Sequence, residues 1–312
     1  MEYTLNGKTE NTCMIGTWAW GTGSNGGKMV FGKSYSREQL AETFHAAYGA
    51  GFTFWDTAEV YGMGTAETLL GELIKDKEVT LSTKHFPNKK HKPGECRAAL
   101  EASLKRLGVD CVDLYWLHSP QNLEQNMTEL AECQKAGLTK SIGLSNGSAG
   151  QIQLADEVLR ANGVRLAAVQ NHYSLLAIER EAEALRYCAD NSILFFGYMI
   201  LEQGALSGHY DAKHRFPTFS MRGFSFGKGK FKRIQGLIDY ERELAMKYGV
   251  DCSQIPIAWA VAKGVIPIIG LTKPNHAQSL NDGLSLVLTG DEIAELEKLA
   301  LASGVTCKGA WE

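Results

Sequence analysis

Short apolar runs rich in Val, Ile, Phe and Trp alternate with longer amphipathic stretches along the whole chain. Short runs of this kind are typical of buried strands, and apolar positions spaced three and four apart are typical of helices. Eight strand-like runs occur, at residues 14–18, 52–58, 79–85, 111–118, 140–146, 166–171, 193–199 and 265–272. Helical patterns such as 37–50, 95–107, 123–136 and 151–161 lie between them. Eight strands alternating with helices predict an α/β fold, the (β/α)8 TIM barrel.

The same pattern predicts three additions to the barrel. The Asn6-Gly7 pair is typical of a two-residue hairpin turn, which would close the bottom of the barrel. Residues 203–229, after the seventh strand-like run, are too long for an ordinary loop and indicate a lid. A further helical pattern at 291–301 predicts a C-terminal helix. No linker or composition break marks a second domain, so residues 1–312 are expected to form one domain.

Composition and charge exclude several classes of function. The 312 residues include 32 Lys and Arg against 35 Asp and Glu, and this net charge of -3 creates no field that would gather nucleic acid or an anionic membrane. The N-terminus lacks the pattern of a signal peptide, and the most apolar segment, 255–271, falls short of the ~20 residues that span a bilayer. The seven cysteines are scattered without a C-x-x-C pair, which favours free thiols and no metal site. We therefore expect a cytoplasmic protein.

Candidate chemistry lies at the ends of the predicted strands, where active sites of this fold are built. The second run ends at Asp56 with Tyr61 five residues on, the third ends at Lys84, and the fourth ends at His118. A nearby ammonium favours a phenolate, so Lys84 is expected to lower the pKa of Tyr61 from its ordinary ~10 and make it a proton donor. Each residue alone is more often structural, but their joint placement on neighbouring strands predicts carbonyl reduction.

Several motifs then identify a family resemblance. The stretch DTAEVYGMGTAETLLGELI (56–74), STK in the third run, LYWLHSP in the fourth, SIGLSN, VQNHYSLL and PIIGLTKPNH resemble the aldo-keto reductase superfamily over nearly the whole chain. The resemblance implies a TIM barrel that binds NADP(H) across its top. It also implies a catalytic tetrad of Tyr61, Lys84, Asp56 and His118, in which the tyrosine protonates the oxygen of an aldehyde or ketone as hydride reaches its carbon.

The resemblance further implies a cofactor site. Its residues would be Thr17, Trp18, Ser145, Asn146, Gln170, Tyr198, Leu201, Gly204, Thr272, Lys273 and Gln278. Ser145, Asn146 and Gln170 would hold the nicotinamide carboxamide, Tyr198 would stack on the ring, and Lys273 would meet the 2'-phosphate of NADPH. The chain departs from the family pattern at Met199, Glu202 and His276, all toward the adenosine end, so NAD remains possible.

The expected substrate is a small hydrophobic or aromatic carbonyl compound. The candidate pocket walls Trp20, Phe86, Trp116 and Trp311 are aromatic, although core packing explains each of them equally well.

A different class of function stays open, because potassium-channel β subunits of this superfamily keep the tetrad and act as NADPH-binding redox-sensing subunits. The expected assembly is a monomer or small homo-oligomer. Eight basic residues within 213–233 indicate either a solvated loop or a belt over the cofactor phosphates.

Overall fold

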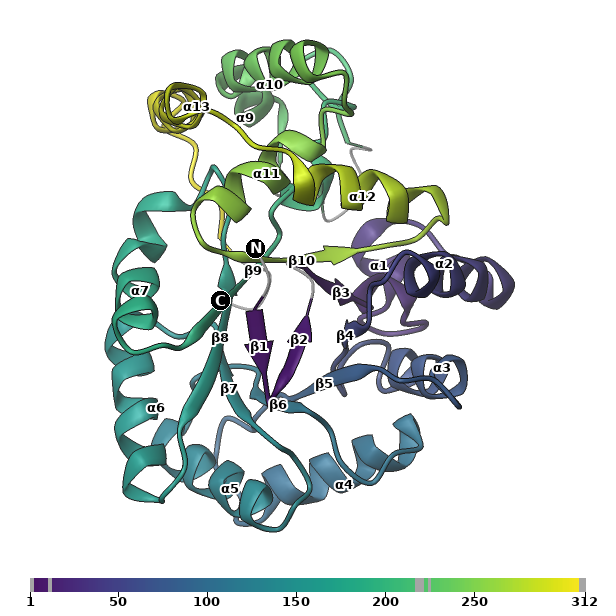
Figure 1. Ribbon diagram of the computed structural model, residues 1–312, viewed down its shortest axis with the longest axis vertical. Coiled ribbons are helices and arrows are strands. Elements are labelled where there is room, and N and C mark those ends of the chain that lie inside the picture. Colours follow the sequence, from purple (N-terminus) through teal and green to yellow (C-terminus); the bar gives the residue numbers. More distant parts are fainter. Residues whose placement is uncertain (1–2, 11–12, 217–221, 224–225, 309–312) are drawn as a thin grey trace.

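The computed structural model describes residues 3–10, 13–216, 222–223 and 226–308. Eight parallel strands close into a barrel in the order β10-β3-β4-β5-β6-β7-β8-β9, and helices surround it (Figure 1). The strands are β3 (Met14–Gly16), β4 (Phe54–Asp56), β5 (Thr80–His85), β6 (Leu114–Leu117), β7 (Ile142–Ser145), β8 (Leu166–His172), β9 (Leu194–Tyr198) and β10 (Ile266–Gly270). Each strand falls within or beside one of the predicted runs, so the TIM barrel is confirmed.

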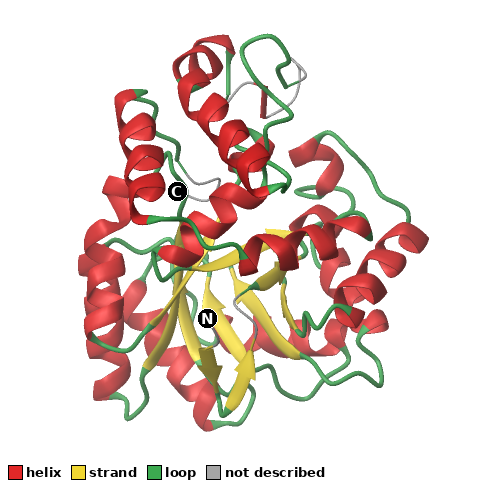
Figure 2. Ribbon diagram, turned by 45° about the horizontal axis from the view of Figure 1, so that its top comes forward, coloured by secondary structure: helices red, strands yellow, loops and turns green. Residues whose placement is uncertain are grey.

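Helices follow the strands around the ring, as the amphipathic stretches predict (Figure 2). Between β3 and β9 lie η1 (Trp18–Trp20), α1 (Gly27–Phe31), α2 (Arg37–Gly49), α3 (Thr65–Leu73), α4 (Glu95–Leu107), α5 (Leu123–Lys135), α6 (Ala149–Ala161) and α7 (Ile178–Asp190). After β9 come η2 (Glu202–Gly204), α9 (Lys228–Arg233), α10 (Gln235–Tyr248) and α11 (Gln254–Ala262), then α12 (Asn275–Ser285) and the C-terminal helix α13 (Gly290–Ala302) after β10.

The predicted hairpin lies across the barrel bottom. Strands β1 (Tyr3–Leu5) and β2 (Lys8–Glu10) pair antiparallel, and both turn residues, Asn6 and Gly7, have positive φ angles of 53° and 77°. Asn6 holds the hairpin in place, because its Nδ2 donates to the Asp113 carbonyl at 2.9 Å. Figure 1 shows the two strands in the middle of the ring.

Two apolar layers stabilise the barrel, because alternate residues of a strand point to opposite sides. Inward-facing side chains, among them Met14, Phe54, Trp116 and Phe196, fill the interior and are fully buried. A larger cluster fills the space between the strands and the helices. The barrel is therefore a packed core, and polar chemistry is confined to its ends.

The buried carboxyl group of Glu241 predicts a stability that depends on pH. Neither carboxyl oxygen of this α10 residue has a hydrogen-bond partner among the described residues, and burial raises the pKa well above its ordinary value. The folded state therefore keeps a proton that the unfolded chain releases near pH 4.5, so this contribution to stability is complete below that pH and declines as the pH rises toward the folded-state pKa.

We expect Glu241→Met to be more stable than the wild type by about 1–3 kcal/mol at pH 8, because an unsatisfied buried polar group is removed. The advantage should shrink at pH 5. Urea unfolding at the two pH values measures it, with Glu243→Met, an exposed position of the same helix, as the control. An advantage that does not change with pH would contradict the titration.

Candidate active site

Three neighbouring strands bring the predicted tetrad together at the carboxyl end of the barrel. Asp56 ends β4, Lys84 lies in β5, and His118 follows β6, while Tyr61 stands in the turn after β4. The Lys84 Nζ contacts the Asp56 carboxylate and lies 2.9 Å from the Thr57 carbonyl and 3.3 Å from the Tyr61 hydroxyl. The rings of Tyr61 and His118 meet edge to face with centroids 5.9 Å apart. All four tetrad side chains are buried.

Close packing of two loops holds Tyr61 against this group. Its amide donates to the Ala58 carbonyl at 3.0 Å, and the ring stacks on Trp18 with centroids 5.8 Å apart. A Cβ atom at Gly21 would lie only 2.7 Å from the Gly62 nitrogen, so the loop after β3 reaches the loop after β4 only with glycine there. The two loops together form the wall beside the tyrosine.

The pKa of Tyr61 differs from the sequence-based expectation. Burial raises it well above its ordinary value, and the negative charge of Asp56 adds to the rise. The lowering expected from Lys84 does not offset this rise, because the Asp56 carboxylate contacts the ammonium and burial lowers the pKa of Lys84 itself. Tyr61 is therefore a protonated phenol at neutral pH, as a proton donor must be.

His118 is a neutral imidazole in this environment. Burial lowers its pKa well below the ordinary value, and the positive charges of Lys84 and His85 lower it further. A neutral imidazole can still donate one N–H to a carbonyl oxygen. The Phe86 ring packs edge to face on it, with centroids 5.6 Å apart, and so helps to fix its orientation.

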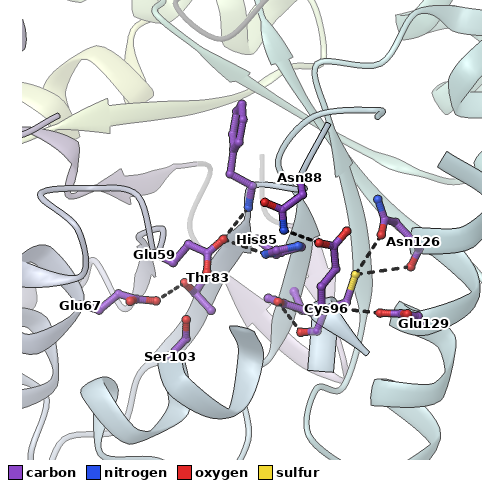
Figure 3. Close-up of polar contacts among 12 residues, drawn as sticks. Glu59, Glu67, Thr83, His85, Asn88, Cys96, Ser103, Asn126 and Glu129 are labelled. Atoms are coloured by element: carbon purple, nitrogen blue, oxygen red, sulfur yellow. Dashed lines mark hydrogen bonds and ion pairs between the residues drawn. The ribbon is translucent and has the colours of Figure 1, made fainter. Parts of the chain in front are cut away.

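Sequence reasoning missed a second pair of groups, Glu59 and His85, beside the tetrad. His85 Nδ1 lies 2.7 Å from Glu59 Oε1, and the Phe86 amide donates to the same oxygen at 2.7 Å (Figure 3). The carboxylate thus ties the turn after β4 to the start of the loop after β5. The adjacency of these residues to Tyr61 and Lys84 in the sequence was the signal that could have identified them.

The residues expected to hold a nicotinamide carboxamide lie together at the ends of β7, β8 and β9. Asn146 Nδ2 donates to the His118 carbonyl at 2.8 Å, and its Oδ1 accepts from the Tyr198 hydroxyl at 2.6 Å. The Ser145 hydroxyl donates to the Gln170 carbonyl at 2.8 Å. Gln170 Nε2 is buried and has no acceptor among the described residues, so this donor suits the oxygen of a carboxamide.

Glu202, the acidic departure from the family pattern, is buried against residues at the end of β8. Its side chain is buried, and its Oε1 accepts from the Ser174 hydroxyl and lies 2.6 Å from His172 Nε2. The turn achieves this with positive φ angles at Met199, Glu202 and Gln203. The carboxylate is therefore held by side chains of the protein at the end of β8.

The expected adenosine end lies around the start of α12. Lys273 is exposed there, and burial together with the charges of Lys273 and His209 lowers the pKa of His276. His209 comes from the long segment after β9 and was not predicted from the sequence. Of the other residues expected here, Gln278 donates to Asp282 at 2.9 Å, and the Thr272 carbonyl accepts from Gln39 at 2.8 Å.

The basic residues after β9 have structural partners in several cases. Arg222 donates to the Gln203 carbonyl and to the Phe31 carbonyl of α1, each at 3.0 Å, so it joins the long segment to the loop after β3. Arg233 donates to the carbonyls of Ser303 and Gly304, the two residues that follow α13. Both guanidinium groups therefore hold the segment in place.

The remaining turn residues expected at the cofactor include Leu201 and Gly204, and the Gly204 amide donates back to the Leu201 carbonyl at 2.8 Å.

The aromatic residues expected to form the substrate pocket differ in their surroundings. Phe86 packs against His118, next to Trp18, a residue expected at the cofactor, which stacks on Tyr61. Trp20 is instead buried between the barrel and the helices with its Nε1 donating to Leu271, and Trp116 fills the barrel interior. These two tryptophans are core residues, and we do not retain them as pocket walls. Trp311 lies outside the described residues.

Thr17 has a structural position as well. It is buried, and its hydroxyl donates to the Asp56 carbonyl at 3.0 Å, so it fixes the end of β4.

Across the described part of the chain, no three His, Cys, Asp or Glu side chains are grouped so as to bind a metal ion. No described helix combines the length and hydropathy that crossing a membrane requires.

Comparisons with known proteins find relatives along nearly the whole chain. The model of the Aldo/keto reductase family matches residues 13–301. The chain is 31% identical over 303 residues to the aldo-keto reductase yakc [NADP(+)] of Schizosaccharomyces pombe, covering 90% of this chain and 87% of the relative. It is 30% identical over 311 residues to a chloroplastic pyridoxal reductase of Arabidopsis thaliana, covering 93% and 83%.

Solved structures show the same fold. A glycerol dehydrogenase from Gluconobacter oxydans superimposes with a TM-score of 0.81 at 25% identity, covering 96% of this chain and 94% of that one. An aldo/keto reductase from Klebsiella pneumoniae, solved in complex with NADP and acetate, superimposes with a TM-score of 0.72 at 24% identity, covering 94% and 92%. The family match over nearly the whole chain and the shared barrel lead to one conclusion: the chain belongs to the aldo/keto reductase family of oxidoreductases.

Proposed function

We propose that this protein reduces a small aldehyde or ketone to an alcohol with NADPH, and that Tyr61 donates the proton. The observation that carries the proposal is the buried group at the barrel end, where the Tyr61 hydroxyl lies 3.3 Å from Lys84 Nζ and the Tyr61 ring packs on His118. Polar groups buried this deeply are costly unless they serve a function or compensate one another. Lys84 and Asp56 compensate each other, and Tyr61 and His118 bring to the same place the hydroxyl and the imidazole that carbonyl reduction requires.

The residues at the ends of β7, β8 and β9 fit a nicotinamide cofactor. Gln170 Nε2 would donate to the carboxamide oxygen, Ser145 and Asn146 would line the same group, and the Tyr198 ring would support the nicotinamide. The S. pombe relative is named as an NADP(+) enzyme, which favours the phosphorylated cofactor here. When bound, NADPH supplies the hydride that forms the new C–H bond of the alcohol.

The tetrad supplies the remaining parts of the reaction. His118 donates a hydrogen bond to the carbonyl oxygen and polarises the C=O bond, and Tyr61 transfers its proton to that oxygen as the carbon receives hydride. One hydride and one proton thus convert the carbonyl into an alcohol. The phenolate left on Tyr61 is stabilised by the Lys84 ammonium at 3.3 Å until solvent returns the proton.

Steady-state oxidation of NADPH with a panel of aldehydes and ketones tests this function. The panel should include aromatic aldehydes, because Trp18 and Phe86 flank the tetrad, and pyridoxal, because the Arabidopsis relative is named a pyridoxal reductase. We expect turnover on the order of a few per second with the best substrate. Turnover orders of magnitude slower with every compound would favour the redox-sensing alternative.

Lys273 is proposed to bind the 2'-phosphate of NADPH. It is the exposed cation beside His276, whose lowered pKa keeps that imidazole neutral at pH 7. A charge-assisted hydrogen bond contributes ~1.5–3 kcal/mol, so Lys273→Ala should weaken NADPH binding by roughly ten- to a hundredfold and leave NADH almost unchanged. Titrations of both cofactors at two salt concentrations measure the effect, and the variant should show the smaller salt dependence.

The control for this experiment is Lys263→Ala, which removes an ammonium paired with Glu297 at 3.0 Å on the outer helices. It should leave the affinity for both cofactors unchanged. If Lys273→Ala weakens NADPH and NADH by the same factor, Lys273 does not bind the 2'-phosphate and the cofactor preference lies elsewhere.

A further inference from the structure

A buried carboxylate stands behind the aromatic ring proposed to support the nicotinamide. Glu202 lies four residues beyond Tyr198, in the turn after β9, and its side chain is 2% exposed. Its Oε1 lies 2.6 Å from His172 Nε2 and accepts from the Ser174 hydroxyl. His172 is the last residue of β8, and Ser174 lies in the loop after it. The carboxylate is thus enclosed beneath the cofactor end of the barrel.

Hydrogen-bond directions place the negative charge on Glu202. Arg180 Nη2 lies 3.1 Å from His172 Nδ1, and a guanidinium can only donate, so Nδ1 accepts and the imidazole proton is on Nε2. His172 is then neutral and donates to Glu202. The Ser174 oxygen accepts from the Leu176 amide at 3.1 Å and directs its own hydroxyl proton to the carboxylate. Glu202 needs no proton of its own to form either bond.

The charges packed around Glu202 do not cancel it. Arg180 Nε donates to Glu181 at 3.0 Å, so these two groups neutralise each other. Burial and the nearby Glu202 carboxylate raise the pKa of the Cys307 thiol, which is therefore uncharged. Lys230, the further cation close to Cys307, is only half-buried, and solvent screens its charge more than that of Glu202. Among the described residues, the two side chains that donate to Glu202 are thus an uncharged imidazole and a hydroxyl.

The order of the rings relates this charge to the nicotinamide site. The His172 ring stacks on the Tyr198 ring with centroids 5.7 Å apart and an interplanar angle of 28°. A nicotinamide stacked on Tyr198 must therefore use the opposite face, so that nicotinamide, Tyr198 and His172 form one stack. Glu202 lies beside the His172 end of that stack, because the hydrogen bond from Nε2 runs in the plane of the imidazole ring. Typical stacking distances put the ring about 10 Å from the carboxylate, where an incompletely screened charge still acts.

We propose that Glu202 sets the balance between the oxidised and reduced forms of the bound cofactor by stabilising the positive charge of the oxidised nicotinamide. The proposal rests on the proposed function, because it takes the nicotinamide to stack on Tyr198. NADP+ and NADPH carry the same phosphates and differ by one positive charge on the ring. A carboxylate near the ring therefore changes the ratio of their affinities, and the same field favours hydride donation.

The test compares the dissociation constants of NADP+ and NADPH, measured at pH 8 from quenching of tryptophan fluorescence. Glu202→Gln keeps an oxygen that can accept from His172 and Ser174 but removes the charge. We expect the ratio of the NADP+ constant to the NADPH constant to rise by roughly three- to fifteenfold. Glu202→Asp, which keeps the charge, should stay near the wild-type ratio.

Two further variants make the result decisive. Lys273→Ala should weaken the binding of NADP+ and of NADPH by the same factor, because both carry the 2'-phosphate. The ratio of their dissociation constants should therefore stay unchanged. Arg180→Gln removes the neighbouring positive charge and should move the ratio in the opposite direction, which keeps the test available if Glu202→Gln does not fold. An unchanged ratio in the charge-removing variants that fold overturns the role of Glu202. Failure of the wild type to bind either cofactor contradicts the proposed function instead.

Discussion

Replacement of Tyr61 by phenylalanine should lower carbonyl reduction by ~10²-fold or more, the usual scale for a positioned general acid. The variant keeps the ring that stacks on Trp18 and packs on His118, so the fold and the cofactor affinity should change little. Only the hydroxyl at 3.3 Å from Lys84 Nζ is lost. Steady-state rates with the best substrate, together with cofactor titrations, measure the two effects separately.

Tyr115→Phe is the matched control for this experiment. Tyr115 is also a buried tyrosine, and its hydroxyl donates to the Cys96 carbonyl at 2.9 Å on the outer side of β6. Its loss should cost ~1 kcal/mol of stability and leave turnover unchanged. If Tyr61→Phe retains wild-type turnover, the proton comes from another group and the proposed mechanism is wrong.

The pH dependence of reduction follows from the raised pKa of Tyr61. Because burial and Asp56 keep the phenol protonated far above neutral pH, the proton donor is present throughout the physiological range. His118 stays neutral over the same range because its pKa is lowered. We therefore expect reduction to lose activity only on the alkaline side, at a higher pH than an ordinary tyrosine would give.

The barrel and the tetrad were predictable because each depends on a local pattern. Buried parallel strands are short apolar runs, and the fold places their carboxyl ends on one face, so Asp56, Lys84 and His118 had to lie near one another. The contact between Lys84 and Asp56 follows from the register of the adjacent strands. Asp56 pairs with Ser82 of β5, and Lys84 lies two residues further along β5, so its side chain points to the same side as that of Ser82.

Side-chain surroundings were less predictable, because they depend on segments that are distant in sequence. Trp20 and Trp116 have the residue type of pocket walls, but strand and loop geometry directs them into the core. The pKa of Tyr61 was expected to fall, whereas the compensated charge of Lys84 leaves burial as the dominant influence. Glu202 appeared misplaced in the sequence, because its partner His172 is 30 residues away.

Removal of the Lys84 ammonium should have the largest combined effect on stability and rate. Lys84→Met leaves the Asp56 carboxylate buried, and among the described residues only the Ser82 hydroxyl, at 2.6 Å, still donates to it from a side chain. Breaking one half of a buried ion pair typically costs ~3–5 kcal/mol of stability. Reduction should also fall by ~10²-fold, because nothing cationic then stabilises the phenolate of Tyr61. Urea unfolding and steady-state rates measure the two losses.

The double variant Lys84→Met with Asp56→Asn separates these two effects. Neutralising both partners removes the uncompensated charge, so most of the lost stability should return, while the missing ammonium should keep turnover as low as in Lys84→Met. Adding Lys84→Met to Tyr61→Phe should cost little further activity, because residues that act as a unit are not additive. If turnover recovers together with stability in the double variant, Lys84 serves only the packing of the barrel end, and its proposed effect on Tyr61 is excluded.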